Sequence, residues 1–253
     1  MVAFPIVELL PVRDVNNFHG QQHRTGYYAS RKAGRSLKFE SGTERLRMMF
    51  LDFDPTVTTY TTQPFTLTWD RDGKTYHYTP DLLIVRPGRE RTVEDVKPPQ
   101  FRNSSQNAPA FEAAREAFPP VGLTFNLWSP PSAVLCYNVR HLAGYRWTPV
   151  YMPTISREIL ARTADGPMPL AELAEATGHH MLTRPVIFHL LWTHRLHTDL
   201  EQPLSQNSLI YRSEPGWASE PQETPPIASD PYGGHRYTHA SPGTLSTHPG
   251  REG

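Results

Sequence analysis

The stretch from residue 78 to residue 97 constrains this chain more than any other. Its first half is an apolar run that follows Asp81, and its second half mixes valine and threonine with polar residues as far as Lys97. Between them, Arg86-Pro87-Gly88-Arg89 has the composition of a chain reversal. The pattern predicts a β-hairpin in which Asp81 enters the first strand and Lys97 leaves the second.

Side-chain alternation then indicates which carboxylates of this hairpin lie together. Successive residues of a strand point to opposite faces, so Asp95 and Lys97 share one face and Glu94 points to the other. Asp81 lies at the same end of the antiparallel pair as Lys97. We therefore expect Asp81, Asp95 and Lys97 to converge, and we expect Glu94→Ala to be mild.

Such a group has a chemical use. Two carboxylates held together repel each other, and a hard divalent cation such as Mg²⁺ relieves that repulsion. A lysine beside the cation orients water or stabilises charge on a phosphoryl oxygen. Metal-dependent nucleases use this arrangement. The alternative is an exposed edge strand whose charges only discourage aggregation.

A third carboxylate is expected on the helix that follows Ser41. Ser41 and Glu44 have the spacing of a capping box, which predicts that a helix starts here. Glu44 then either only caps the helix or faces the metal site. Glu40 is a competitor, but it precedes the helix and its direction is less fixed.

Composition excludes several classes of protein. The 25 basic and 25 acidic residues cancel, although the segment from Arg13 to Arg47 is basic and interleaved with tyrosine, which suits contact with phosphates. The alternative for this segment is an irregular arm wrapped on the domain. A single cysteine, Cys136, excludes a disulfide framework and makes a zinc site improbable. No long apolar run is present, so we expect a cytoplasmic protein without a membrane partner.

The order of expected elements indicates an α/β fold with a mixed sheet. A helix, an antiparallel meander, a helix over residues 110–118, a buried strand over 124–128 and a helix over 133–145 follow one another in residues 1–149. Three helices and two short strands then predict a small winged-helix-like domain in residues 150–212, which binds either DNA or protein. Residues 213–253 are rich in proline, serine and histidine and poor in aliphatic residues, which predicts a disordered tail.

Five short motifs together resemble the TnsA-type endonuclease subunit of heteromeric transposases. The resemblance covers about residues 10–150, with the following helical region similar to the carboxy-terminal domain of that group. The motifs, in order, are Phe39-Glu40-Ser41-Gly42-Thr43-Glu44-Arg45, Leu51-Asp52-Phe53-Asp54-Pro55, Gln63-Pro64-Phe65, Tyr78-Thr79-Pro80-Asp81 and Asp95-Val96-Lys97-Pro98.

The resemblance implies a restriction-endonuclease-like PD-(D/E)xK core. It implies catalysis by Glu44, Asp81, Asp95 and Lys97, with the three carboxylates binding Mg²⁺, or Mn²⁺ in its place. It also implies cleavage of one strand, at the 5′ ends of a transposon in double-stranded DNA. The implied partners are a DDE-type, TnsB-like transposase subunit and an AAA+, TnsC-like ATPase regulator.

Two other functions stay open from the sequence. The same core occurs in stand-alone restriction or repair nucleases, because a fold does not determine its function. A non-catalytic DNA-binding assembly subunit is the other alternative, although the presence of all four polar site residues argues against it. Thr43 and the doubled proline at 98–99 depart from the family pattern without touching the expected ligands.

Overall fold

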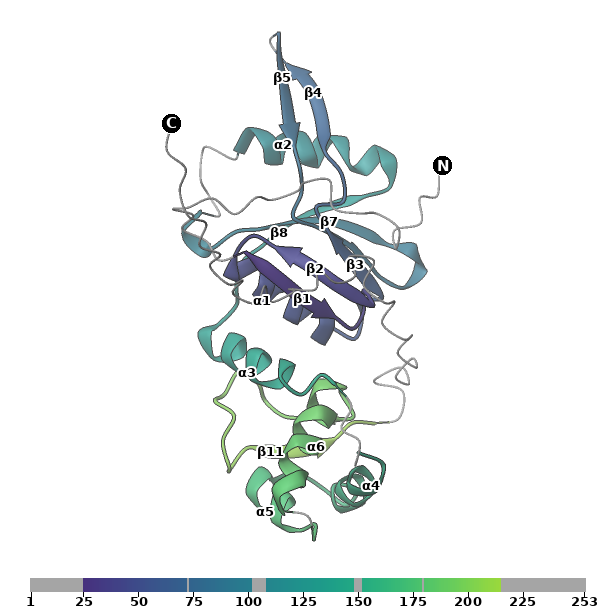
Figure 1. Ribbon diagram of the computed structural model, residues 1–253, viewed down its shortest axis with the longest axis vertical. Helices are drawn as coiled ribbons and strands as arrows, with labels where there is room; N and C mark the ends of the chain where they lie inside the picture. The colour runs from purple at the N-terminus through teal and green to yellow at the C-terminus, as the bar shows by residue number, and fades with distance from the viewer. Residues whose placement is uncertain (1–24, 72, 102–107, 148–151, 179, 215–253) are drawn as a thin grey trace, which may run out of the picture.

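The computed structural model describes residues 25–71, 73–101, 108–147, 152–178 and 180–214. The molecule is elongated, with strands β1 to β8 in one half and the helices that follow residue 150 at the opposite end, together with β11 (Figure 1). The predicted boundary at residue 149 and almost all of the predicted tail lie outside the described residues. No helix in the described ranges is long and apolar enough to cross a membrane.

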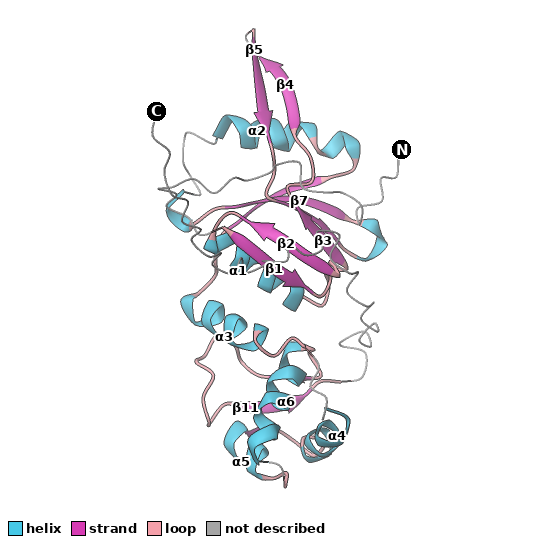
Figure 2. Ribbon diagram, in the orientation of Figure 1, coloured by secondary structure: helices cyan, strands magenta, loops and turns pink. Residues whose placement is uncertain are grey.

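A four-stranded mixed sheet forms the centre of the strand-rich half (Figure 2). Its order is β3 (Thr59–Thr62), β6 (Leu82–Val85), β7 (Arg91–Val96) and β8 (Thr124–Trp128). The first three strands pair antiparallel, and β8 pairs parallel to β7. The predicted hairpin is thus confirmed as β6–β7, but β7 is an inner strand and not the exposed edge considered above. The burial predicted for β8 is wrong, because β8 is an edge strand that is partly exposed.

One helix covers each face of this sheet. Alternate residues of β6 point to opposite sides, as Leu82 packs in the core that α1 (Gly42–Phe53) shares and Leu83 packs in a second cluster with α2 (Ala108–Ala117). Short 3₁₀ turns connect the elements, at η2 (Pro87–Arg89), η3 (Pro99–Phe101) and η4 (Pro119–Val121). In η2, Gly88 has a φ of 75°, which is the left-handed conformation that the Pro-Gly turn required.

Two further hairpins flank the sheet. The first, β1 (Gly26–Ser30) with β2 (Arg35–Phe39), corrects the expectation of an irregular arm. Its inner side is fixed by Asp52 at the end of α1, whose carboxylate accepts hydrogen bonds from the hydroxyls of Tyr28, Ser30 and Tyr60. The second, β4 (Leu67–Arg71) with β5 (Lys74–Tyr78), projects from the body (Figure 1), and Gly73 before β5 has a φ of 70°; Asp72 of the predicted Asp-Gly turn lies outside the described residues.

The helical end has the element order of a winged helix. It consists of α4 (Met152–Arg162), β9 (Met168–Pro169), α5 (Leu170–Glu175), α6 (His180–Trp192), β10 (Leu196–His197) and β11 (Leu209–Arg212). The three short strands pair in the order β10-β11-β9. The predicted helices and both wing strands are present, whereas β9 was not predicted.

The winged helix is joined to the rest of the molecule by packing and hydrogen bonds. One hydrophobic core runs from the central sheet through α3 (Ala133–Ala143) into α4, α5 and α6, and the buried Cys136 lies on α3. The fully buried Asn138 of α3 donates to the carbonyls of Leu200 and Gln202 in the wing and accepts from the amide of Leu204. The wing is therefore attached to α3 through its own backbone.

The carboxy-terminal end of α1 contacts the winged helix directly. Phe53 packs against Trp192 with ring centroids 5.2 Å apart, and its carbonyl lies 2.5 Å from Nε2 of His194. The Lys32 ammonium donates to the neighbouring carbonyl of Asp54. Helix α1 thus begins near the sheet end that holds Asp81 and ends against the winged helix.

Candidate active site

Asp81, Asp95 and Lys97 meet at one end of the central sheet, as strand alternation predicted. The Lys97 ammonium lies 3.5 Å from Oδ2 of Asp81 and 3.6 Å from Oδ2 of Asp95. The side chain of Asp95 is only 4% exposed, whereas those of Asp81 and Lys97 are 22% and 24% exposed. The Lys97 ammonium therefore lies between two carboxylates that are mostly shielded from water.

The backbone of the two strands produces this convergence. Leu82 pairs with Glu94, so Asp81 continues the ladder opposite Asp95. The amide of Asp81 lies 3.3 Å from Oδ1 of Asp95, and the amide of Val96 donates to Oδ2 of Asp81 at 2.7 Å. These contacts hold both carboxylates over the sheet end, so the site does not depend on a loop for its shape.

The electrostatics match a site that favours a cation. Burial, followed by the charge of Asp95, raises the pKa of Asp81 to about 7. Burial also raises the pKa of Asp95, although Lys97 offsets part of this effect. For Lys97, burial alone lowers the pKa, but attraction to the two aspartates outweighs it, so its pKa lies above the ordinary value. The single positive charge of Lys97 thus does not fully compensate the negative charges of Asp81 and Asp95.

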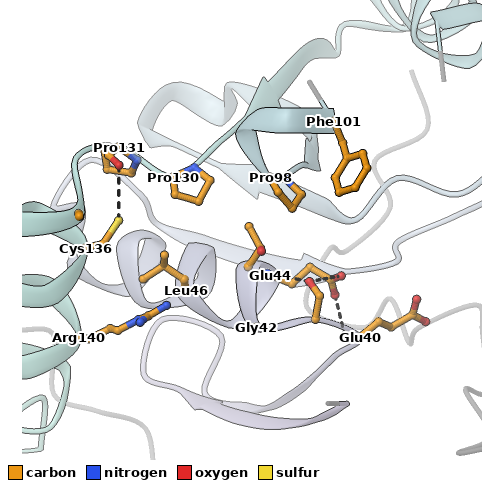
Figure 3. Close-up of a pocket in the computed structure, with 13 residues that line it drawn as sticks. Glu40, Gly42, Glu44, Leu46, Pro98, Phe101, Pro130, Pro131, Cys136 and Arg140 are labelled. Carbon is orange, nitrogen blue, oxygen red and sulfur yellow. Dashed lines mark hydrogen bonds between the residues drawn. The ribbon is translucent and has the colours of Figure 1, made fainter. Parts of the chain in front are cut away.

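Glu44 is engaged in capping α1. Ser41 is the N-cap, and its hydroxyl accepts from the Glu44 amide at 3.1 Å. In return, one Glu44 carboxylate oxygen accepts from the Ser41 hydroxyl at 2.9 Å and the other from the Glu40 amide at 2.7 Å (Figure 3). Charges at the site still affect this residue, because burial raises the pKa of Glu44 and Lys97 partly lowers it. Glu44 is therefore beside the site and held by its cap.

The arrangement fits a magnesium ion held by two protein carboxylates. Across the described residues, no group of three or more His, Cys, Asp and Glu side chains is arranged to hold a metal ion, because Glu44 is turned into its cap. Mg²⁺ usually binds through one or two carboxylates together with substrate phosphates and water. Asp81 and Asp95 supply such oxygen ligands. Burial raises the pKa of both carboxyl groups, and for Asp81 the charge of Asp95 adds to this effect, so a bound cation would stabilise their charged forms.

Glu94 lies on the opposite face, as predicted, but it is neither exposed nor solvated. Its carboxylate receives Nε and Nη2 of Arg47 at 2.5 and 3.1 Å and the amide of Asn126 at 2.6 Å. Glu94 is 1% exposed and Arg47 is 8% exposed. Arg47 also lies over the Trp128 ring, 5.0 Å from its centroid. The mild effect of Glu94→Ala on cleavage stays a prediction, but the solvated position considered for Glu94 is wrong. Glu94 belongs to a buried ion pair that joins α1 to β7, so its loss should destabilise the fold.

Several basic residues of the amino-terminal segment have structural partners. Besides the contacts of Lys32 and Arg47, Arg31 donates to the carbonyl of Arg146 at 2.5 Å and Arg35 donates to the Thr61 hydroxyl at 2.9 Å. Arg31, Lys32 and Arg35 hold the β1–β2 hairpin against the rest of the molecule. The predicted phosphate contact therefore loses much of its support for the described part of the segment.

A pocket of about 770 Å³ lies beside Glu44 (Figure 3). Its walls are the start of α1, the start of α3 and the segments 98–101 and 130–131. Glu40 and Glu44 lie on the α1 side, and Arg140 lies on α3. The pocket provides open space next to the first turn of α1.

Two buried polar groups near the site escaped the sequence analysis. The Tyr78 side chain is 8% exposed, and its hydroxyl is buried close to the Asp95 carboxylate. Burial, followed by the charge of Asp95, raises the pKa of Tyr78. Gln63 is 9% exposed and adjoins Asp81. Both residues stand in motifs quoted above, but their burial depends on strand pairings that no local pattern reveals.

Comparison with known families agrees with this geometry. Residues 54–129 match the family model described as the TnsA-like endonuclease N-terminal domain. The matched range contains Asp81, Asp95 and Lys97, whereas α1 with Glu44 precedes it. No curated protein matches the chain.

Proposed function

We propose that this chain, which carries a TnsA-like endonuclease domain, is the Mg²⁺-dependent DNA-cleaving subunit of a heteromeric transposase. In this proposal it cuts one strand, the 5′ end, at each transposon end. The observation that supports it most is the convergence of Asp81, Asp95 and Lys97 within the matched domain. Metal-dependent nucleases use this combination of carboxylates and a cation to hydrolyse a phosphodiester.

The side chains have separate roles. Asp81 and Asp95 hold the cation, and the strand ladder keeps them oriented before substrate arrives. Lys97 places a positive charge where the phosphoryl oxygens become more negative in the transition state, and it orients the attacking water. Its position between both aspartates keeps the ammonium protonated at neutral pH, because their attraction raises its pKa.

Mg²⁺ bound by Asp81 and Asp95 would supply Lewis-acid chemistry, polarising a phosphoryl oxygen and lowering the pKa of bound water. Mn²⁺ has the same preference for oxygen ligands. Glu44 adds negative charge at the edge of the site and contributes to the pKa of Asp81. It is the third carboxylate of the proposed set, and because both of its oxygens accept hydrogen bonds in the cap, it would act on the cation through its charge.

The winged helix is mainly a docking surface for protein in this proposal. The exposed start of α6 is apolar, with Met181 89% exposed and Leu182 40% exposed. The residue that follows this pair on the exposed side is Arg184. Affinity for duplex DNA depends on grouped cations, and this helix offers few. The proposed partners are a DDE-type transposase subunit bound to the transposon ends and an AAA+ ATPase regulator.

The chemistry is tested by single substitutions in a cleavage assay. Asp81→Ala and Lys97→Ala are each expected to abolish Mg²⁺-dependent cutting of transposon-end DNA while circular dichroism stays that of a folded protein. Glu112→Gln, at an exposed position of α2, is the matched control and should cut as the wild type does. Cleavage by the Asp81 variant at the wild-type rate would overturn the assignment of the site.

The role of the partner is tested with the same DNA. Cutting should be weak for the chain alone and strong once the transposase is added, because the chain itself has few grouped cations with which to select a site. Efficient and site-specific cutting by the chain alone would favour a stand-alone nuclease. Removal of Mg²⁺ with EDTA should stop cutting in either case.

A further inference from the structure

Gln63 lies directly beside Asp81 in an unusual backbone conformation. It follows β3, whose last residue pairs with Leu82, and its amide donates to the carbonyl of Asp81 at 3.0 Å. Its φ is 45°, in the left-handed region that favours glycine. Among the described residues, His194 is the other non-glycine with a positive φ.

This position carries two energetic costs. A left-handed backbone is strained for a residue with a Cβ. In addition, Oε1 of Gln63 is buried and has no hydrogen-bond donor among the described residues. Buried polar groups nearly always have a partner, so an orphan calls for an explanation. Glycine at this position would avoid both costs, which indicates that the glutamine side chain provides something else.

The side chain provides a bridge to the start of α1. Nε2 of Gln63 donates to the Glu40 carboxylate at 2.6 Å. The Glu40 amide in turn donates to the Glu44 carboxylate at 2.7 Å. A continuous chain of hydrogen bonds therefore runs from the Asp81 backbone through Gln63 and Glu40 to Glu44. This chain of hydrogen bonds joins the sheet end that holds Asp81 to the first turn of α1.

We infer that Gln63 is a positioning residue, which holds Glu40 and through it the Glu44 carboxylate at a fixed place relative to Asp81. This inference rests on the proposed function, since it assigns Gln63 a role in forming the cation site. It differs from a purely structural role in one respect. Loss of the side chain should impair the site even where it does not destabilise the fold.

Two substitutions separate these possibilities. Gln63→Gly removes the bridge and also relieves the strained φ, so its melting temperature should equal or exceed that of the wild type. Gln63→Ala removes the bridge but keeps the strain, so its melting temperature should fall. If Gln63 has only a structural role, cleavage should be lost in Gln63→Ala, which is less stable, and kept in Gln63→Gly. If Gln63 is a positioning residue, cleavage should fall equally in both variants. Gln206→Ala, at an exposed site in the wing, is the matched control.

The first measurement is the Mg²⁺ dependence of the melting temperature of the full chain, which requires no cleavage. The Mg²⁺ concentration at half-maximal shift should rise at least threefold in Gln63→Gly and in Glu40→Ala, which removes the oxygen that accepts from Gln63. Combining the two substitutions should add little, because both break the same bridge. In the cleavage assay with the transposase, kcat should fall at least tenfold in Gln63→Gly, while KM for DNA changes less than twofold.

The outcomes discriminate between the inference and the function on which it rests. A wild type that responds to Mg²⁺, with Gln63→Gly responding and cutting identically, overturns the inference and leaves the function intact. A rise in KM alone would also overturn it, since that would identify Gln63 as a DNA contact. A wild type that neither responds to Mg²⁺ nor cuts overturns both.

Discussion

Glu94→Ala removes one half of the ion pair that is buried between α1 and β7. The arginine left behind, Arg47, is 8% exposed, and its contact with the Trp128 ring would remain among the described residues. Breaking a buried ion pair by removing one partner costs about 3–5 kcal/mol, because the remaining charge stays desolvated. Asn126 would lose its acceptor as well. We therefore expect a loss at the upper part of this range.

The double substitution Arg47→Met with Glu94→Leu provides the other half of the test. Replacing both partners of a buried pair by apolar residues of similar volume is often neutral or stabilising. The double variant should therefore recover most of the stability that Glu94→Ala loses. A recovery of this kind would show that the unpaired charge, and not a lost packing volume, causes the damage.

Urea unfolding followed by circular dichroism measures these differences. For a protein of this size, about 1 kcal/mol corresponds to about 2–4 °C in melting temperature, so Glu94→Ala should melt at least about 8 °C lower. Glu112→Ala on the surface of α2 is the control and should change stability by less than about 0.5 kcal/mol. A loss below about 1 kcal/mol for Glu94→Ala, or a double variant no better than the single one, would refute this reasoning.

Three further perturbations test other parts of the structure. The pKa of Asp81 is raised from 3.8 to about 7 in the folded protein without metal. Between pH 3.8 and pH 7 the folded protein therefore keeps a proton on Asp81 that the unfolded chain releases. The free energy of unfolding thus falls as the pH rises through this range. In EDTA at pH 8, Asp81→Asn should therefore be more stable than wild type by up to about 4 kcal/mol in urea unfolding, and the difference should disappear near pH 4. Asn138→Ala removes three hydrogen bonds to the wing and should lower the melting temperature by several degrees. An unchanged melting temperature would mean that the conformation of the wing does not depend on these bonds. Truncation after Glu214 should leave the melting temperature within about 1 °C, because the removed sequence has few aliphatic residues to bury, and a larger fall would contradict the predicted tail.

The parts of the site that sequence could predict are those that depend on local geometry. Side-chain alternation has a period of two wherever a strand forms, so the convergence of Asp95 with Lys97 followed once the hairpin was recognised. The cap at Ser41 and the left-handed Gly88 are likewise encoded within four residues. These predictions needed no knowledge of which distant segments pair.

The remaining parts depend on contacts between residues far apart in the chain. Arg47 and Glu94 are 47 positions apart, and no pattern around either one reveals the other. The burial of Glu94 depends on β8 pairing alongside β7, a parallel pairing that requires the whole intervening crossover. Gln63 reads locally as an ordinary turn residue before proline, and only the ladder to Asp81 places it at the site.

The length of helix α1 sets the distance between the candidate active site and the winged helix. Its 12 residues span about 18 Å, with Glu44 in its first turn and Phe53 against Trp192 and His194 at its end. One inserted or deleted residue would rotate one end by about 100° relative to the other. Either the carboxylate or the aromatic contact would then face away. We expect natural and engineered versions of this chain to vary in length at the β4–β5 hairpin tip and to keep the length of α1 constant.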